Sequence, residues 1–148
     1  MTDIEDLEAL LASETGLAVV TTLRSDGRPL SSVVNVGVVD HPATGDRVVA
    51  FVAIGSSARL DHLRRRPTIN VLVRRGWQWA AIDGDAQLVG PDDAYPDIDG
   101  EALRQLLRRV FRAAGGTHDD FDEFDRVMVD DRRCVVLVVP RRCYSNPS

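Results

Sequence analysis

Apolar residues alternate with polar or small ones along several short segments of the chain, a period that is typical of β-strands. These segments are rich in valine, isoleucine and threonine and are separated by turn-forming residues. They predict strands at 17–24, 30–39, 47–54, 68–74, 77–82, 86–89 and 134–139. The segment 47–54 is apolar from Val48 onward, so we expect this strand to be central and buried on both faces.

Apolar residues three and four positions apart predict helices elsewhere in the chain. The predicted helices lie at 4–15, 58–66, 103–114 and 119–129. A hydroxyl at Thr2 and a carboxylate at Glu5 have the spacing of a capping box for the first helix. Pro67 prevents continuation of the second helix.

Short turn segments determine how the predicted strands pair. Asp26-Gly27, the segment 41–46 and Asp83-Gly84 are each expected to form tight turns, which require antiparallel neighbours. Seven strands with few helices favour a small closed or nearly closed barrel, which removes exposed sheet edges. The prediction is therefore one α+β domain over residues 1–148, dominated by β-structure, with short flanking helices.

The charged residues narrow the kinds of partner that the chain can bind. A net charge of −5 argues against nucleic acid, which needs a basic surface. All 18 basic residues are arginine, so lysine chemistry such as a Schiff base is excluded. An anion site would have to use arginine, histidine, hydroxyl groups or backbone N–H groups.

The apolar runs are too short for a membrane span, and the acidic N-terminus does not resemble a signal peptide. We therefore expect a cytoplasmic protein with no membrane partner. Cys134 and Cys143 are expected to be reduced, because they are too far apart along an extended strand to form a disulfide.

The segment 55–59, Gly-Ser-Ser-Ala-Arg, is the best local candidate for a binding site. It joins the apolar strand to a predicted helix N-terminus, where unpaired N–H groups carry partial positive charge. Ser56 and Ser57 add hydroxyl donors, and Arg59 adds a guanidinium group suited to phosphate. A serine N-cap followed by a surface arginine explains the same residues, so both interpretations remain open.

Other residues carry weaker signals. Trp77 and Trp79 could line a pocket for a flat ring, or could fill the core or an interface between subunits. His41, His62 and His118 lack metal-ligand spacing, so no metal is expected. The chain contains no Ser-His-Asp signature, Walker loop or dinucleotide-binding glycine pattern.

Four segments together resemble a known family. They are 18–29 at the first hairpin, 57–67 at the second helix, 79–88 around Gly84, and 128–137 before the last strand. In this order and spacing they are similar to the pyridoxamine 5′-phosphate oxidase-like, FMN-binding split β-barrel proteins. The closer resemblance is to the actinobacterial branch of F420-dependent flavin/deazaflavin oxidoreductases.

The resemblance implies a homodimer with two equivalent cofactor sites at the subunit interface. It places the cofactor phosphate at Ser56, Ser57 and Arg59, where relatives often have lysine in place of Arg59. The positions that it places near the ring are Ser32, Val33, Val34, Ala53 and Ile54, with Trp77 and Trp79 approaching from the partner subunit.

The resemblance also implies a reaction, namely hydride transfer from reduced coenzyme F420 to a small unsaturated acceptor. FMN-dependent oxidoreductase activity in the same fold is one alternative. A non-catalytic cofactor or tetrapyrrole-binding protein is another. Vitamin B6 chemistry is disfavoured, because residues 141–148 lack the tryptophan that true pyridoxamine phosphate oxidases carry there. No residue is assigned as a catalytic acid.

Overall fold

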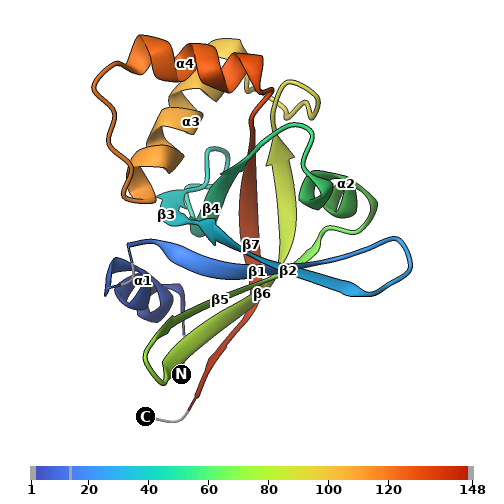
Figure 1. The fold of residues 1–148 in the computed structure, drawn as a ribbon, viewed down its shortest axis with the longest axis vertical. Coiled ribbons are helices and arrows are strands. Elements are labelled where there is room, and N and C mark those ends of the chain that lie inside the picture. The colour runs from blue at the N-terminus through green and yellow to red at the C-terminus, as the bar shows by residue number, and fades with distance from the viewer. Residues whose placement is uncertain (1–2, 14, 147–148) are drawn as a thin grey trace.

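The computed structural model describes residues 3–13 and 15–146, which form one antiparallel sheet with four helices (Figure 1). The strands are β1 Leu17–Leu23, β2 Pro29–Asn35, β3 Gly37–Asp40, β4 Arg47–Ala53, β5 Thr68–Arg75, β6 Gln78–Val89 and β7 Cys134–Ser145. The helices are α1 Ile4–Ser13, α2 Ala58–Arg65, α3 Gly100–Ala113 and α4 Phe121–Asp130. The strand order across the sheet is β2-β1-β5-β6-β7-β4-β3. The prediction of a β-dominated split barrel with short flanking helices is confirmed.

The two edge strands of this sheet, β2 and β3, are separated in sequence only by Val36. The predicted single strand 30–39 is therefore wrong, because the chain leaves one edge and enters the other at Val36. The Val36 side chain is fully buried, and its N–H donates to the Gly16 carbonyl at 2.7 Å. Among the described strands, no hydrogen-bonded ladder joins β2 to β3. The barrel is therefore split, and its two edge strands are connected only through Val36.

The second half of the sheet contains one long strand where a hairpin was predicted. Asp83 and Gly84 lie inside β6 rather than in a turn. Asp83 pairs with Arg142 and Gly84 with Pro140, so Arg141 is the additional residue of a β-bulge. A Cβ on Gly84 would lie 2.6 Å from the Val139 carbonyl oxygen, which explains the glycine by close backbone contact.

Strand β7 extends six residues beyond Val139, the predicted end. Proline has no N–H to donate to a sheet ladder, so it is uncommon inside a strand. Pro140 is tolerated because β4 pairs with β7 only as far as Val138, and the bulge falls at Pro140 on the β6 side.

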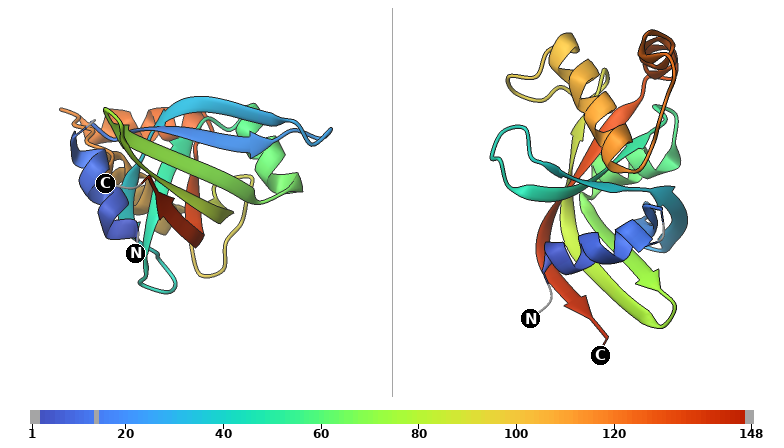
Figure 2. Two further views of the ribbon diagram at one scale, coloured as in Figure 1. Left: turned by 90° about the horizontal axis from the view of Figure 1, so that it is seen from below. Right: turned by 90° about the vertical axis from the view of Figure 1, so that its left-hand side faces the viewer.

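Strands β4 and β7 separate two hydrophobic cores. Phe51 and Val136 face the barrel core, which α1 and α2 also cover. Ala50 and Leu137, on the opposite face of the same strands, contribute to a second core beneath α3 and α4, here called the helical core. The prediction that β4 is buried on both faces is confirmed. Figure 2 (right) shows α3 and α4 at one end of the molecule and α1 with both termini at the other.

The N-terminal helix is capped one residue later than predicted. The Asp3 carboxylate accepts from the N–H groups of Glu5 and Asp6, and the Asp6 carboxylate accepts from the Asp3 N–H. This reciprocal pair is a capping box built from Asp3 and Asp6. The predicted partner Thr2 lies outside the described residues. The longest described helix, α3, has 14 residues, so none of the described helices is long enough to span a membrane.

Candidate functional site

Helix α2 follows β4 after the loop at 54–57 and lies beside the β1–β2 hairpin (Figure 1). Ser57 has extended backbone angles, and its hydroxyl accepts from the Leu60 N–H at 3.4 Å. It is therefore the N-cap, as one of the two sequence interpretations proposed. Leu60 and Leu63 bury the inner face of the helix in the barrel core.

Two polar contacts fix the position of α2. The Thr22 hydroxyl, which is fully buried, lies 2.9 Å from Nδ1 of His62. Arg64 forms a bidentate ion pair with Asp93 through bonds of 2.9 and 2.7 Å, and this carboxylate raises the pKa of Arg64 above its usual value. Sequence reasoning missed both contacts, because the partners lie 40 and 29 residues away along the chain.

Arg59 is the central residue of the candidate site. Its Nε donates to the Ser32 hydroxyl on β2 at 2.9 Å, so two predicted site residues 27 positions apart are brought together. Among residues 3–13 and 15–146, Arg59 forms no ion pair with a carboxylate. The bond to Ser32 orients the guanidinium group and leaves its two terminal amino groups for an anionic ligand.

The donor set at this position fits a phosphate group. Ser56 is exposed and Ser57 partly exposed at the start of α2, whose first N–H groups have no carbonyl partner within the helix. Hydroxyl groups, first-turn N–H groups and the Arg59 side chain are the donors that anions bind at helix N-termini. A phosphate would therefore find positive potential and hydrogen-bond donors on this side of β2.

The predicted ring-contacting residues of β2 divide between the two faces of the sheet. Ser32 and Val34 point toward the barrel core, on the side of Arg59. Val33 points to the opposite face and is 62% exposed. Ala53 is buried in the barrel core, whereas Ile54 follows β4 and is 43% exposed.

The two tryptophans also differ in position. Trp77 lies in the β5–β6 turn with 93% of its surface exposed. Trp79 lies in β6, where its ring packs edge-on against Tyr144 at a centroid distance of 6.0 Å. Trp79 is paired across the sheet with Arg74 and thus lies on the same outward face as Val33. Within the described part of this chain, neither tryptophan forms a hydrogen bond or cation–π contact with Arg59 or Ser32.

The outward face of β1, β2 and β5 carries an exposed apolar patch, here called the outer patch. Val33, Val19 and Leu72 lie side by side in one row across three strands. Leu17, which is 49% exposed, extends the patch, and the residues surround a shallow hollow of about 220 Å³. Such a contiguous apolar surface on a small domain is typical of a protein contact.

Other sequence candidates lack site chemistry. Within the described residues no group of three or more histidine, cysteine, aspartate or glutamate side chains could hold a metal ion. His41 is buried, and its Nδ1 accepts from the Ala43 and Thr44 N–H groups. Cys134 and Cys143 are free thiols, and burial raises the pKa of Cys134 to about 12, so it is not a reactive thiolate.

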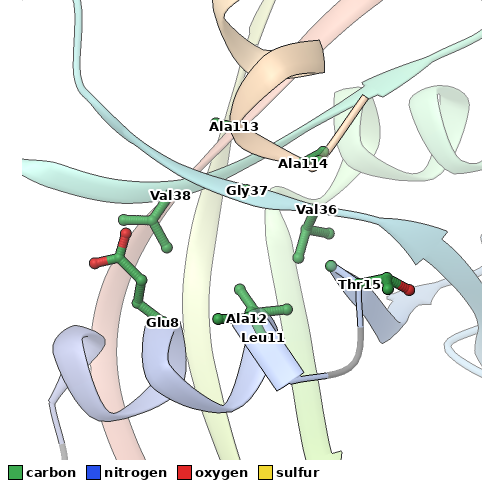
Figure 3. A pocket seen from close by; sticks show the side chains of 11 residues that line it. Glu8, Leu11, Ala12, Thr15, Val36, Gly37, Val38, Ala113 and Ala114 are labelled. Carbon is green, nitrogen blue, oxygen red and sulfur yellow. The ribbon is translucent and has the colours of Figure 1, made fainter. Parts of the chain in front are cut away.

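A small pocket of about 220 Å³ lies between α1, β3 and the end of α3 (Figure 3). Glu8 is the charged side chain in its lining, and Arg47 binds that carboxylate at 2.8 Å. Apart from Thr15, the rest of the lining is apolar or small, as Leu11, Val38 and Ala113 show. We interpret it as a packing gap where α1 and α3 meet the sheet.

Comparison with solved structures identifies this architecture. A conserved hypothetical protein from Mycobacterium tuberculosis matches 98% of this chain and 84% of its own, with 22% identity and a TM-score of 0.70. An F420 reductase matches 88% of this chain and 90% of its own, with 13% identity and a TM-score of 0.60. A pyridoxamine 5′-phosphate oxidase-related, FMN-binding protein from Nostoc punctiforme matches 96% of this chain and 81% of its own, with 14% identity and a TM-score of 0.63.

These similarities cover nearly the whole chain but at low identity, so they establish its fold. No protein-family model matches the sequence. The chain has the split β-barrel fold of pyridoxamine 5′-phosphate oxidase-like, FMN-binding proteins, and its structural neighbours include an F420 reductase.

Proposed function

From this fold, we propose that the protein is a cytoplasmic oxidoreductase that uses coenzyme F420 to reduce a small unsaturated acceptor. The observation that carries the proposal is the contact between Arg59 and Ser32 beside the N-terminus of α2. It assembles anion-binding groups at the position where the family resemblance expects the cofactor phosphate. The F420 reductase among the structural neighbours supports the choice of cofactor.

The remaining predicted positions define the proposed cofactor surface. Ser32 accepts a hydrogen bond from Arg59, Val34 lies on the same face of β2, and Ile54 is exposed at the end of β4. The apolar side chains at positions 34 and 54 would cover one side of a planar ring and exclude water from it. When bound, F420 supplies the hydride-transfer chemistry, and the chain supplies phosphate binding, ring orientation and shielding. No side chain is assigned as proton donor.

The proposal includes a homodimer formed through the outer patch. Burial of Leu17, Val33 and Leu72 against a second copy would remove exposed apolar surface from water. It would also bring Val33 and Trp79, which lie on this face, into the subunit interface. This arrangement therefore supports the proposal that tryptophans approach the cofactor from the partner subunit.

The dimer is tested by Leu17→Arg. Leu17 is 49% exposed, so the substitution is expected to leave the barrel folded while it places a charge in the proposed interface. We expect sedimentation velocity to show a monomer where the unmodified protein is a dimer. Val129→Arg, at an exposed apolar residue on α4, is the control and should remain dimeric. A dimeric Leu17→Arg variant would remove the outer patch from the proposal.

Cofactor binding is tested by titrating the purified protein with F420 and with FMN, and by comparing Arg59→Ala with Arg65→Ala. Loss of a charged hydrogen bond should weaken F420 binding by about 1.5–3 kcal/mol in Arg59→Ala. Arg65 is exposed on the same helix and has no ion pair among the described residues, so its variant should bind like the original. Equal binding by the Arg59→Ala variant would contradict the phosphate assignment.

FMN is the alternative cofactor, favoured by the FMN-binding protein among the structural neighbours. Both cofactors have a phosphate that the α2 site could hold, so the site chemistry alone does not separate them. Preferential binding of FMN would move the protein to the flavin-dependent class. Tight cofactor binding without hydride transfer to any acceptor would favour the non-catalytic binding role.

A further inference from the structure

A pocket of about 390 Å³ lies between α3, α4 and the segment 90–100, on the helical side of the sheet. Its volume is in the range of small-molecule sites. Its larger apolar lining side chains are Pro91, Ile98, Leu103, Leu107, Met128 and Val129. None of the residues proposed for the cofactor lines this pocket.

Polar contacts connect the walls of this pocket to one another. Arg104 on α3 binds Asp125 on α4 at 3.1 Å. Arg132, just after α4, binds Asp92 in the segment 90–100 with one bond of 2.9 Å. That segment ends at Asp99, whose carboxylate caps α3 by accepting from the Ala102 N–H at 2.8 Å. A pocket whose walls are held together in this way is preformed, so a ligand loses less free energy in ordering it.

The charges in the lining are neutralised by partners within the protein. Besides the pairs above, Arg133 binds Asp131 at 2.9 Å, and Arg108 also binds Asp125. These contacts give each arginine in the lining a carboxylate partner, and the Asp99 carboxylate is held by the first turn of α3, so the lining does not require an ionic group on the ligand. Apolar contact is therefore the main source of affinity, with arginine N–H groups at the rim available to a single oxygen acceptor.

We propose that this pocket binds an uncharged, largely apolar small molecule. Met128 adapts the pocket to the ligand, because its unbranched side chain can change conformation at low cost. The pocket is next to the loop that precedes α2, since the Gly55 N–H donates to the Asp131 carbonyl at 3.0 Å. The inference stands on the α3–α4 pocket alone and does not depend on the identity of the cofactor.

The test uses Nile red, an uncharged apolar dye whose fluorescence rises in apolar surroundings. Val129 is 73% exposed and lines the pocket, so Val129→Arg should retain the fold and weaken dye binding about tenfold. Val127→Arg is the matched control, because Val127 is also exposed on α4 but lines a different pocket. Ala94→Trp, which would fill the mouth of the pocket from the segment 90–100, should weaken binding independently.

Competition then tests the ligand class. 1-Decanol should displace Nile red at least about tenfold more effectively than decanoate, because the pocket offers no unpaired cation to a carboxylate. Saturating F420 or FMN should leave dye binding unchanged, which separates this pocket from the cofactor site. The proposal is overturned if Val129→Arg binds the dye as tightly as Val127→Arg, or if decanoate competes as well as decanol.

Discussion

The barrel core and the helical core share strands β4 and β7 but are stabilised differently. Phe51, which is fully buried, packs in a barrel core made of apolar side chains from the sheet, α1 and α2. The helical core also buries apolar residues, among them Leu106 and Phe124, but ion pairs from Arg104 and Arg108 to Asp125 join its two helices. Two of the pockets adjoin α3 and α4. The barrel core is thus held mainly by apolar packing, whereas ion pairs also hold the helical core together beside the α3–α4 pocket.

Truncation of the largest core side chains should show this difference most strongly. Phe51→Ala should lower the free energy of unfolding by about 3–5 kcal/mol, because the tightly packed barrel core cannot collapse into the cavity. Phe124→Ala should fall at the lower end of this range, about 3 kcal/mol, since Phe124 already lines a pocket. Urea denaturation measures both. A larger loss in Phe124→Ala would contradict the comparison.

The contact between the sheet and α3 can be broken at one glycine. A Cβ on Gly37 would lie 2.5 Å from the backbone carbon of Ala113, so Gly37→Ala must displace β3 or the end of α3. We expect a loss of about 1–3 kcal/mol in urea denaturation.

Gly100→Ala is the matched control for this substitution. Gly100 begins α3 and has open space where its Cβ would lie, so alanine should be neutral or stabilise the protein by up to about 1 kcal/mol. Equal destabilisation by both substitutions would show that the close approach of β3 to α3 is not the cause.

The ion pairs of the helical face should have the smallest effect. Hydrogen bonds from Arg108 hold the pKa of Asp125 below its ordinary value, so the contact stabilises the folded state at neutral pH and is lost as the pH falls through that lowered pKa. Asp125→Asn should cost at most about 1 kcal/mol at pH 7, because the amide oxygen can still accept a hydrogen bond from Arg108. In urea denaturation, the difference between variant and original should shrink as the pH falls through the lowered pKa of Asp125. A difference that grows in acid would contradict the assignment.

Comparison of two Asp-Gly pairs shows what local sequence could predict. Asp26-Gly27 forms the expected hairpin turn, with Gly27 at φ +86°. Asp83-Gly84 was predicted as a turn for the same reason, but it lies within β6 opposite β7. The two pairs differ because Asp83-Gly84 pairs with β7, 56 to 59 residues further along the chain. Local turn propensity carries no information about such a distant partner strand.

The candidate site shows the same limit. The start of α2 could be identified from Ser56, Ser57 and Arg59, because a strand, two serines and a helical pattern follow one another in sequence. The contact of Arg59 with Ser32 depends on how β2 packs beside α2, so only the family resemblance brought both residues into one site. The bond between His62 and buried Thr22 had no local signal, since a threonine in a strand pattern is usually explained by strand propensity.

The junction at Val36 has a consequence for self-association. An open sheet exposes unpaired N–H and C=O groups along two edges, and such edges recruit strands from other molecules into aggregates. Here β2 pairs only with β1 and β3 only with β4, so each has one unpaired side within the described residues. Because the two strands meet at Val36, neither edge is open at that end. At the opposite end of β2, Pro29 has no N–H to donate to an added strand. Strands from other molecules would therefore have to add where β2 and β3 separate beyond Val36, rather than along a full-length edge.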